Sequence, residues 1–204
     1  MEGFPISDYR GQAAFGVKEL AVCYMDEDQH VENWHFRVEQ RLDELNYVNR
    51  KQVLKTASFL TRHIHGMEFK DLPEHLPPEF LPSIILRIYE TCFRKFGRVL
   101  IAYKGGEIER KLLNALYIPN INLEVWDCPK YNDLVSVYSP PDMLNCGLHT
   151  HFSHTVILPH CPKQETFVFK MWLKLVIERF NKKELIYLFC LYSSHVSTKG
   201  TIAG

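Results

Sequence analysis

The chain has 204 residues, of which 46% are hydrophobic and 24% charged, a composition that is typical of a globular protein and excludes a disordered one. Lys plus Arg and Asp plus Glu both number 24, so the formal net charge is zero, which excludes binding to nucleic acid through bulk charge. A local basic face is compatible with this balance. The length is typical of one large domain or two small ones.

The first half of the chain shows a strand pattern followed by two helical patterns. Residues 17–38 contain two runs of β-forming residues around a polar turn and predict a β-hairpin. Apolar residues at helical spacing predict helices over 51–64 and 80–96, and we expect Gly97 to end the second.

The second half alternates short apolar strands with helices. It predicts a strand over 99–103, a helix over 107–116, a strand over 121–125, an irregular segment over 126–160 and a helix over 165–180. Residues 184–192 fit a helix and a strand equally. This order predicts an α/β fold, a mixed β-sheet flanked by helices, in a single domain over 1–195 with a flexible C-terminal tail over 196–204.

The sequence predicts neither a membrane-spanning segment nor a secretory signal. The apolar run over 185–192 is much shorter than the roughly 20 residues that cross a bilayer. The N-terminus is acidic and contains Pro5, unlike a secretory signal, and six cysteines are too few for a disulfide scaffold. We therefore expect an intracellular protein, cytoplasmic and/or nuclear, with reduced thiols and no membrane partner.

Cysteine and histidine residues are concentrated between Cys146 and Cys161. Cys146-Gly-Leu-His149 has the spacing of two zinc ligands on one turn, and Cys161 would return at the start of the following helix. His151, His154, His160 and Cys128 are rival ligands for the same ion. A polar loop with buried cysteines gives the same pattern, so spacing alone leaves the zinc site open.

A second segment, Ala102-Tyr-Lys-Gly-Gly-Glu-Ile-Glu109, runs from a strand through two glycines into a helix. Such glycines permit close approach of a ligand, and a helix N-terminus favours anions. The segment lacks the Gly-Lys-Ser/Thr of a phosphate-binding loop, and an ordinary strand-turn-helix connection is the better explanation of the segment taken alone.

Read in order, these segments resemble the DEDDh-type 3′–5′ exonucleases, which have an RNase H-like fold. The hairpin is similar to the second and third strands of that family. Three later segments are similar to its motifs, namely Leu60-Thr-Arg-His-Ile-His-Gly66, the glycine-containing segment 102–109, and His160-Cys-Pro-Lys-Gln-Glu165. The resemblance covers most of residues 4–180 and implies an RNase H-like mixed sheet.

The carboxylates that the exonuclease chemistry needs are altered here. Active members bind two magnesium or manganese ions through four carboxylates and use a histidine as general base. The first motif would be Asp8-Tyr-Arg10, in which the arginine repels a cation, and the second aspartate falls on Ile108. An active Mg- or Mn-dependent exonuclease would therefore rely on Asp8, on Glu107 or Glu109, and on Glu165, with His160 as base.

A subgroup of this superfamily fits the departures better. The chain is similar to Maelstrom domains, which resemble DEDDh exonucleases that have lost their catalytic carboxylates and carry a Glu-Cys-His-Cys zinc set. This resemblance implies the zinc ligands Glu19, Cys146, His149 and Cys161, in a closed structural site. The insertion between His149 and Cys161 is longer than the family pattern predicts.

The same resemblance implies a zinc-stabilised, degenerate exonuclease domain that binds single-stranded RNA and retains weak ribonuclease activity at most. It also implies a role in small-RNA silencing of transposons. Single-strand binding requires basic groups beside aromatic rings. The basic residues expected near the cleft are Arg94, Lys95, Arg98, Lys104, Arg110 and Lys111. A catalytically dead protein-interaction module is the alternative without nucleic acid.

Overall fold

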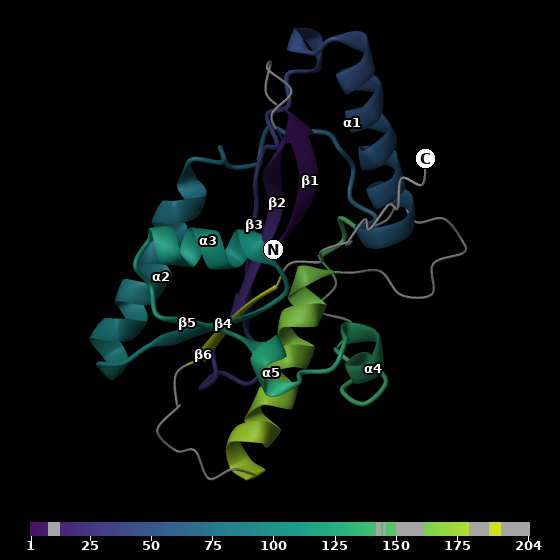
Figure 1. Cartoon of the computed structure of the whole chain (residues 1–204). Helices are drawn as coiled ribbons and strands as arrows, with labels where there is room; N and C mark the ends of the chain where they lie inside the picture. Colours follow the sequence, from purple (N-terminus) through teal and green to yellow (C-terminus); the bar gives the residue numbers. More distant parts are fainter. Residues whose placement is uncertain (8–12, 142–143, 145, 150–160, 180–187, 193–204) are drawn as a thin grey trace.

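The computed structural model describes residues 1–7, 13–141, 144, 146–149, 161–179 and 188–192 (Figure 1). It confirms an α/β fold. Among the described residues, the strands form two three-stranded sheets, one with the order β1-β2-β3 and one with the order β5-β4-β6, so the expected single mixed sheet is wrong. The expected C-terminal tail over 196–204 lies outside the described residues.

The first sheet is antiparallel and contains the predicted hairpin. β2 (Ala13–Cys23) pairs with β3 (Val31–His35) on one side and with β1 (Glu2–Ser7) on the other. Sequence reasoning missed β1, which is short and contains a proline. Gly3 is required in β1 because a Cβ there would lie 2.0 Å from the Gly16 carbonyl oxygen of β2.

The second sheet is parallel. β4 (Leu100–Lys104) lies between β5 (Asn120–Asn122) and β6 (Leu188–Tyr192), so the ambiguous C-terminal segment is a strand where it is described. β6 also contacts β2, which brings the two sheets together. The predicted strand over 121–125 is wrong beyond Asn122, because the Asn122 side chain accepts the Glu124 backbone N–H and starts the 3₁₀ helix η3 (Leu123–Trp126).

The helices follow the sequence pattern closely. α2 (Phe80–Phe96) has the predicted bounds and ends at Gly97, whose φ of 73° is left-handed. The first predicted helix begins earlier than expected because Asn46 caps it. The remaining helices are η1 (Leu42–Glu44), α1 (Tyr47–Leu60), the π-helical turn η2 (Thr61–His65), α3 (Glu107–Ala115), α4 (Tyr131–Val135) and α5 (Pro162–Arg179). α4 lies within the segment that was predicted to be irregular.

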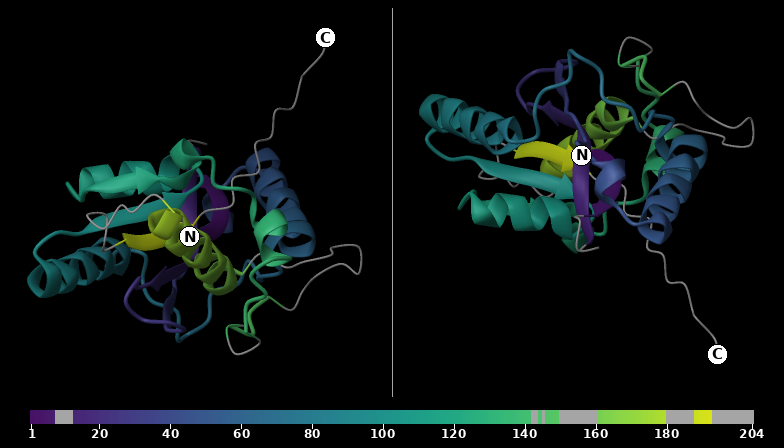
Figure 2. Two further views of the ribbon diagram at one scale, coloured as in Figure 1. Left: turned by 90° about the horizontal axis from the view of Figure 1, so that it is seen from below. Right: turned by 90° about the horizontal axis from the view of Figure 1, so that it is seen from above.

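Helices cover both faces of β4. One hydrophobic cluster joins α2 and α3 to Ile101 and Tyr103, and a second joins α4 and α5 to Ala102 on the opposite face. Figure 2 shows α2 and α3 beside the parallel sheet and α1 at the opposite end of the molecule. Within the described part of the chain, no helix is both long and apolar enough to cross a membrane.

Candidate metal centre

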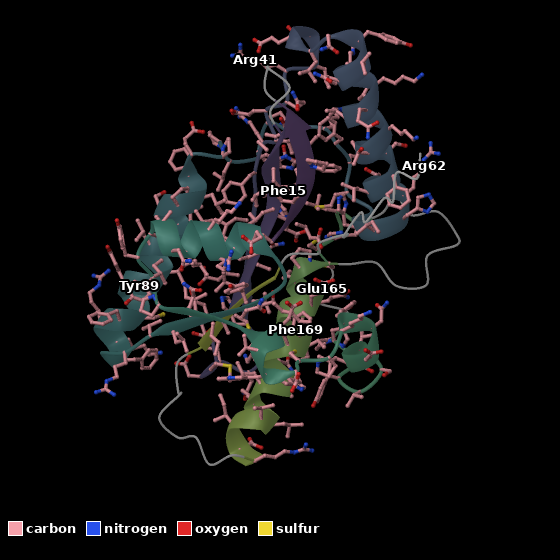
Figure 3. The ribbon with its side chains drawn as sticks, in the orientation of Figure 1. Phe15, Arg41, Arg62, Tyr89, Glu165 and Phe169 are labelled. Carbon is pink, nitrogen blue, oxygen red and sulfur yellow. The ribbon has the colours of Figure 1, made fainter. Side chains whose placement is uncertain are left out.

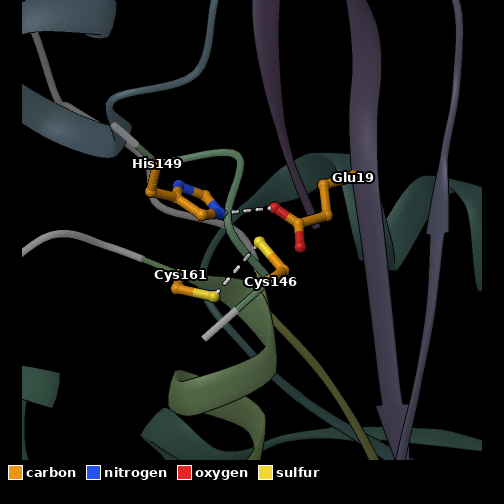
Figure 4. Close-up of side chains that lie close together, drawn as sticks. All are labelled: Glu19, Cys146, His149 and Cys161. Carbon is orange, nitrogen blue, oxygen red and sulfur yellow. Dashed lines mark hydrogen bonds and ion pairs between the residues drawn. The ribbon is translucent and has the colours of Figure 1, made fainter. Parts of the chain in front are cut away.

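Four side chains from three segments meet beside β2. They are contributed by β2, by the loop over 146–149 and by the residue before α5, as Figure 4 shows. One ligand atom from each lies within 4.8 Å of all the others, and among the described residues no second group of three or more such side chains exists. The four residues are Glu19, Cys146, His149 and Cys161, the set that the Maelstrom resemblance implied.

Glu19 is fully buried, and two side chains of β3 orient its carboxylate. Its Oε1 atom accepts a hydrogen bond from Asn33 Nδ2 at 2.9 Å, and the Nε2 atom of His35 lies 3.7 Å away. Asn33 and His35 lie two positions apart on a strand, so they share one face. Their contacts leave the Oε2 atom of Glu19 directed at His149, 2.9 Å from Nε2.

His149 is held from its other side by the backbone. Its Nδ1–H donates to the carbonyl oxygen of His65, at the end of the π-helical turn η2. Gly66 follows with φ 67°, a left-handed conformation that turns the chain away and leaves this carbonyl accessible. Because Nδ1 donates to this carbonyl, Nε2 is the nitrogen that faces the cluster and could bind a metal after losing its proton, as in most zinc-bound histidines.

A helix N-terminus positions one cysteine, and a tight turn positions the other. Cys161 directly precedes α5, and its carbonyl accepts the N–H of Glu165 at 2.9 Å, so its sulfur sits at a helix N-terminus that favours a thiolate. Cys146 is followed by Gly147 with φ 73°, and the tight turn lets the Leu148 backbone N–H donate to the Cys146 sulfur. The two sulfurs lie 3.7 Å apart.

The electrostatics of the cluster favour a bound positive charge. Burial alone would raise the pKa of Glu19, but the hydrogen bonds from His149 and His35 hold it well below its usual range. Burial disfavours the charged imidazole, yet Cys161 and Glu19 raise the pKa of His149 to about 11. The hydrogen bond between the sulfurs lowers the pKa of Cys161 and raises that of Cys146, so the pair shares one proton. A metal ion can replace these protons.

The spacing of the donors fits zinc. Two thiolates bound tetrahedrally at about 2.3 Å from zinc are about 3.8 Å apart, and the sulfurs of Cys146 and Cys161 are 3.7 Å apart. The widest separation, 4.8 Å, requires a closure of only about 1 Å for a tetrahedral ion. Two sulfurs, one imidazole and one carboxylate are also a donor set that zinc accepts.

The basic residues expected in an RNA cleft divide into two groups. Lys104 is wrong as a phosphate ligand because it is buried, donates to the Cys128 carbonyl and lies over the Phe169 ring. Its stem faces the core because alternate residues of β4 point into the α4 and α5 layer. The other five are exposed, namely Arg94, Lys95, Arg98, Arg110 and Lys111.

The carboxylates of the exonuclease alternative are held in other interactions. Glu107 is exposed and pairs with Arg110 at 2.5 Å, whereas Glu109 is fully buried with its Oε1 atom 3.5 Å from the Met1 nitrogen. Glu165 is fully buried on the first turn of α5, and Figure 3 shows it beside Phe169 on that helix. Among the described residues these carboxylates form no metal-binding group, and Asp8 and His160 lie outside that part of the chain.

The remaining rival ligands do not join the cluster where they are described. Cys128 is buried in the α4 and α5 layer, and His151, His154 and His160 lie outside the described residues. Sequence reasoning missed Asn33, His35 and the His65 carbonyl. The available signal was the period-2 spacing of Asn33 and His35 on the strand that pairs with β2.

No family model, curated protein or solved structure matches the chain.

Proposed function

We propose that this chain is a zinc-stabilised domain in which Glu19, Cys146, His149 and Cys161 hold one zinc ion. The observation that supports this most strongly is the convergence of four donors from three segments within 4.8 Å. The imidazole is fixed by a backbone carbonyl and the carboxylate by a side-chain amide. Such supporting contacts are typical of metal sites and raise affinity because the donors need not reorient on binding.

The zinc has a structural role. Four protein donors complete a tetrahedral shell, so no position is left for a substrate or a water molecule. Glu19, His149 and Cys161 are buried, and the ion would join β2 to the loop over 146–149 and to the start of α5. Binding a metal to the folded chain alone stabilises that fold by the binding free energy.

We further propose that the domain is a degenerate RNase H-like exonuclease fold that binds single-stranded RNA, in small-RNA silencing of transposons. The order of antiparallel strands, parallel strands and alternating helices supports the fold. The absence of a carboxylate metal group among the described residues favours a degenerate domain with weak ribonuclease activity at most. Release of mononucleotides that depends on magnesium or manganese would instead establish the active exonuclease.

The proposed RNA surface lies on α2 and on the loop that follows it. Arg94, Lys95 and Arg98 are exposed there, and the Phe93 ring, 49% exposed, lies 6.0 Å from the Tyr89 ring. Exposed rings beside basic groups are the pattern that binds single strands by stacking and phosphate contacts. Figure 3 shows Tyr89 on α2, remote from Arg62 on η2.

Two measurements test these proposals separately. Elemental mass spectrometry of untagged protein should find one zinc per chain, retained in Cys92→Ala and lost in Cys146→Ser. Absence of zinc from the wild-type protein would refute the metal site. For RNA, filter binding across salt concentrations should show weaker binding and a salt slope shallower by about 0.7 in Arg94→Glu. Arg62→Glu is the matched control, and equal effects of both variants would refute the α2 surface.

A further inference from the structure

The two cysteines of the cluster differ in exposure, because Cys146 is partly exposed and Cys161 is buried. Of the five cysteines whose side chains the structure describes, Cys146 is the one that is not buried. Cys161 is only 1% exposed, and its sulfur lies 3.7 Å from that of Cys146. An accessible thiol beside a buried second thiol is the arrangement of an attacked cysteine and its resolving partner.

The other described cysteines are poorly suited to oxidation. Cys92 and Cys128 are buried, with exposed fractions of 3% and 7%. Cys23 is buried against the Thr166 carbonyl of α5. Since an oxidant must reach the sulfur to react with it, these positions react slowly with peroxide.

We propose that Cys146 and Cys161 are a peroxide-oxidisable pair, in which Cys146 is the modified residue and Cys161 closes a disulfide with it. The release of metal that accompanies this step rests on the proposed zinc site. The pairing of the two sulfurs does not, because it follows from their contact in this chain.

The step balances with hydrogen peroxide as the oxidant. When the proton that the pair shares lies on Cys161, the Cys146 sulfur attacks one peroxide oxygen, which forms a sulfenic acid and releases hydroxide. Cys161 then gives up that proton, and its sulfur attacks the Cys146 sulfur, forms the S–S bond and expels a second hydroxide. One thiolate, one thiol, one peroxide and one proton give one disulfide and two waters, and the sulfurs lose the two electrons that the peroxide gains.

The geometry requires a short movement. The sulfurs must approach from 3.7 Å to a bond length of about 2.05 Å. Cys161 is fixed at the first turn of α5 by its carbonyl, so the Cys146 turn is the part that moves. The disulfide removes both thiolates from the metal shell, and only Glu19 and His149 remain as donors. Two donors hold zinc far more weakly than four, so the ion is released.

The test treats purified full-length protein with increasing hydrogen peroxide and measures two quantities. Peptide mapping by mass spectrometry without reduction should find a Cys146–Cys161 disulfide before any other cysteine product. A colorimetric zinc chelator should report one zinc released per disulfide formed, and dithiothreitol with added zinc should reverse both changes. Cys128→Ala should behave as the wild type, whereas Cys146→Ser should form no disulfide at Cys161.

Several outcomes distinguish this inference from the zinc proposal. If the protein holds no zinc but the disulfide still forms first, the zinc site fails and the oxidisable pair stands. If peroxide oxidises Cys92 or Cys128 first, or carries Cys146 to sulfinic acid without a disulfide, the pair is refuted even when zinc is present. The mapping uses wild-type protein, so it decides the question even if Cys146→Ser does not fold.

Discussion

His149 and Glu19 lie 130 positions apart in the sequence, yet the Nε2 atom of one is 2.9 Å from the Oε2 atom of the other. This contact joins the loop over 146–149 to the central strand of the antiparallel sheet. It brings a carboxylate, an imidazole and two sulfurs to one buried point. The stability of the domain should therefore depend on what occupies that point.

Removal of zinc should lower the thermal stability of the domain. A ligand present at 100 times its Kd adds about 2.7 kcal/mol to the free energy of unfolding, which corresponds to about 5–11 °C in Tm for a chain of this size. Differential scanning calorimetry with and without a chelator measures the change. Cys146→Ser should have a low Tm that the chelator does not alter, and an equal chelator effect on that variant would contradict the prediction.

Loss of the contact that orients Glu19 should weaken zinc binding without abolishing it. Asn33→Ala removes the hydrogen bond to Glu19 Oε1, and supporting contacts of this kind change metal affinity by about 10–100-fold. Competition with a chelator of known affinity measures the effect. Asn49→Ala, on α1, is the control and should bind zinc as the wild type does.

Replacement of the carboxylate ligand itself should have a larger effect. Glu19→Gln keeps the volume of the side chain and removes its charge, so the site loses one anionic donor. We expect zinc affinity to fall by more than in Asn33→Ala, as measured in the same competition assay. Glu44→Gln, an exposed residue paired with Arg41, provides the control. A Glu19→Gln protein with wild-type affinity would show that the site uses three donors.

The buried ammonium of Lys18 should make stability depend on Asp71 and on pH. Lys18 Nζ lies 2.8 Å from Asp71 Oδ1, and it also contacts the Lys70 carbonyl and His75 Nδ1. Burial opposes the charge of Asp71, but Lys18 and two backbone N–H groups hold the pKa of Asp71 below 3.8. A lowered folded-state pKa contributes stability above the unfolded value, and that contribution is lost as the pH falls through the folded value.

Asp71→Asn should therefore destabilise the protein by about 1–3 kcal/mol at pH 7, because Lys18 loses its anionic partner. The difference from the wild type should shrink at pH values below the unfolded-state pKa of Asp71. Denaturant unfolding at both pH values measures it. A difference that stays constant with pH would show that lost hydrogen-bond geometry, and not charge, causes the destabilisation.

The Phe93 ring should contribute to RNA binding by stacking. Phe93→Ala is expected to weaken binding by about tenfold, since a base stacked on an aromatic ring contributes about 1–3 kcal/mol. Phe80, at the other end of α2, has the same exposed fraction of 49% and is the matched control. Fluorescence anisotropy with a labelled single-stranded RNA measures both variants. Equal losses in the two would indicate a general effect on α2.

The local elements of this protein were determined by the sequence itself. α2 was predicted at its observed bounds because its apolar spacing and terminal glycine act through contacts within a few residues. The turn at Cys146 and His149 is equally local. Strands were predicted less well. β1 contains Pro5 and was missed, although it pairs with the next strand along the chain, and β5 is ended by the capping of η3 by Asn122.

The candidate site was decided by the tertiary structure. A family resemblance supplied Glu19 as a ligand, but only the pairing of β2 with β3 and the packing of α5 bring its carboxylate to the two sulfurs. The tertiary structure also decides which basic residues are exposed, because Lys104 is buried whereas Arg94 is on the surface. Spacing along the chain determines which residues are neighbours on one helical turn or one strand. Whether a side chain points into the core or to solvent depends on which segments pack against each other in the tertiary structure.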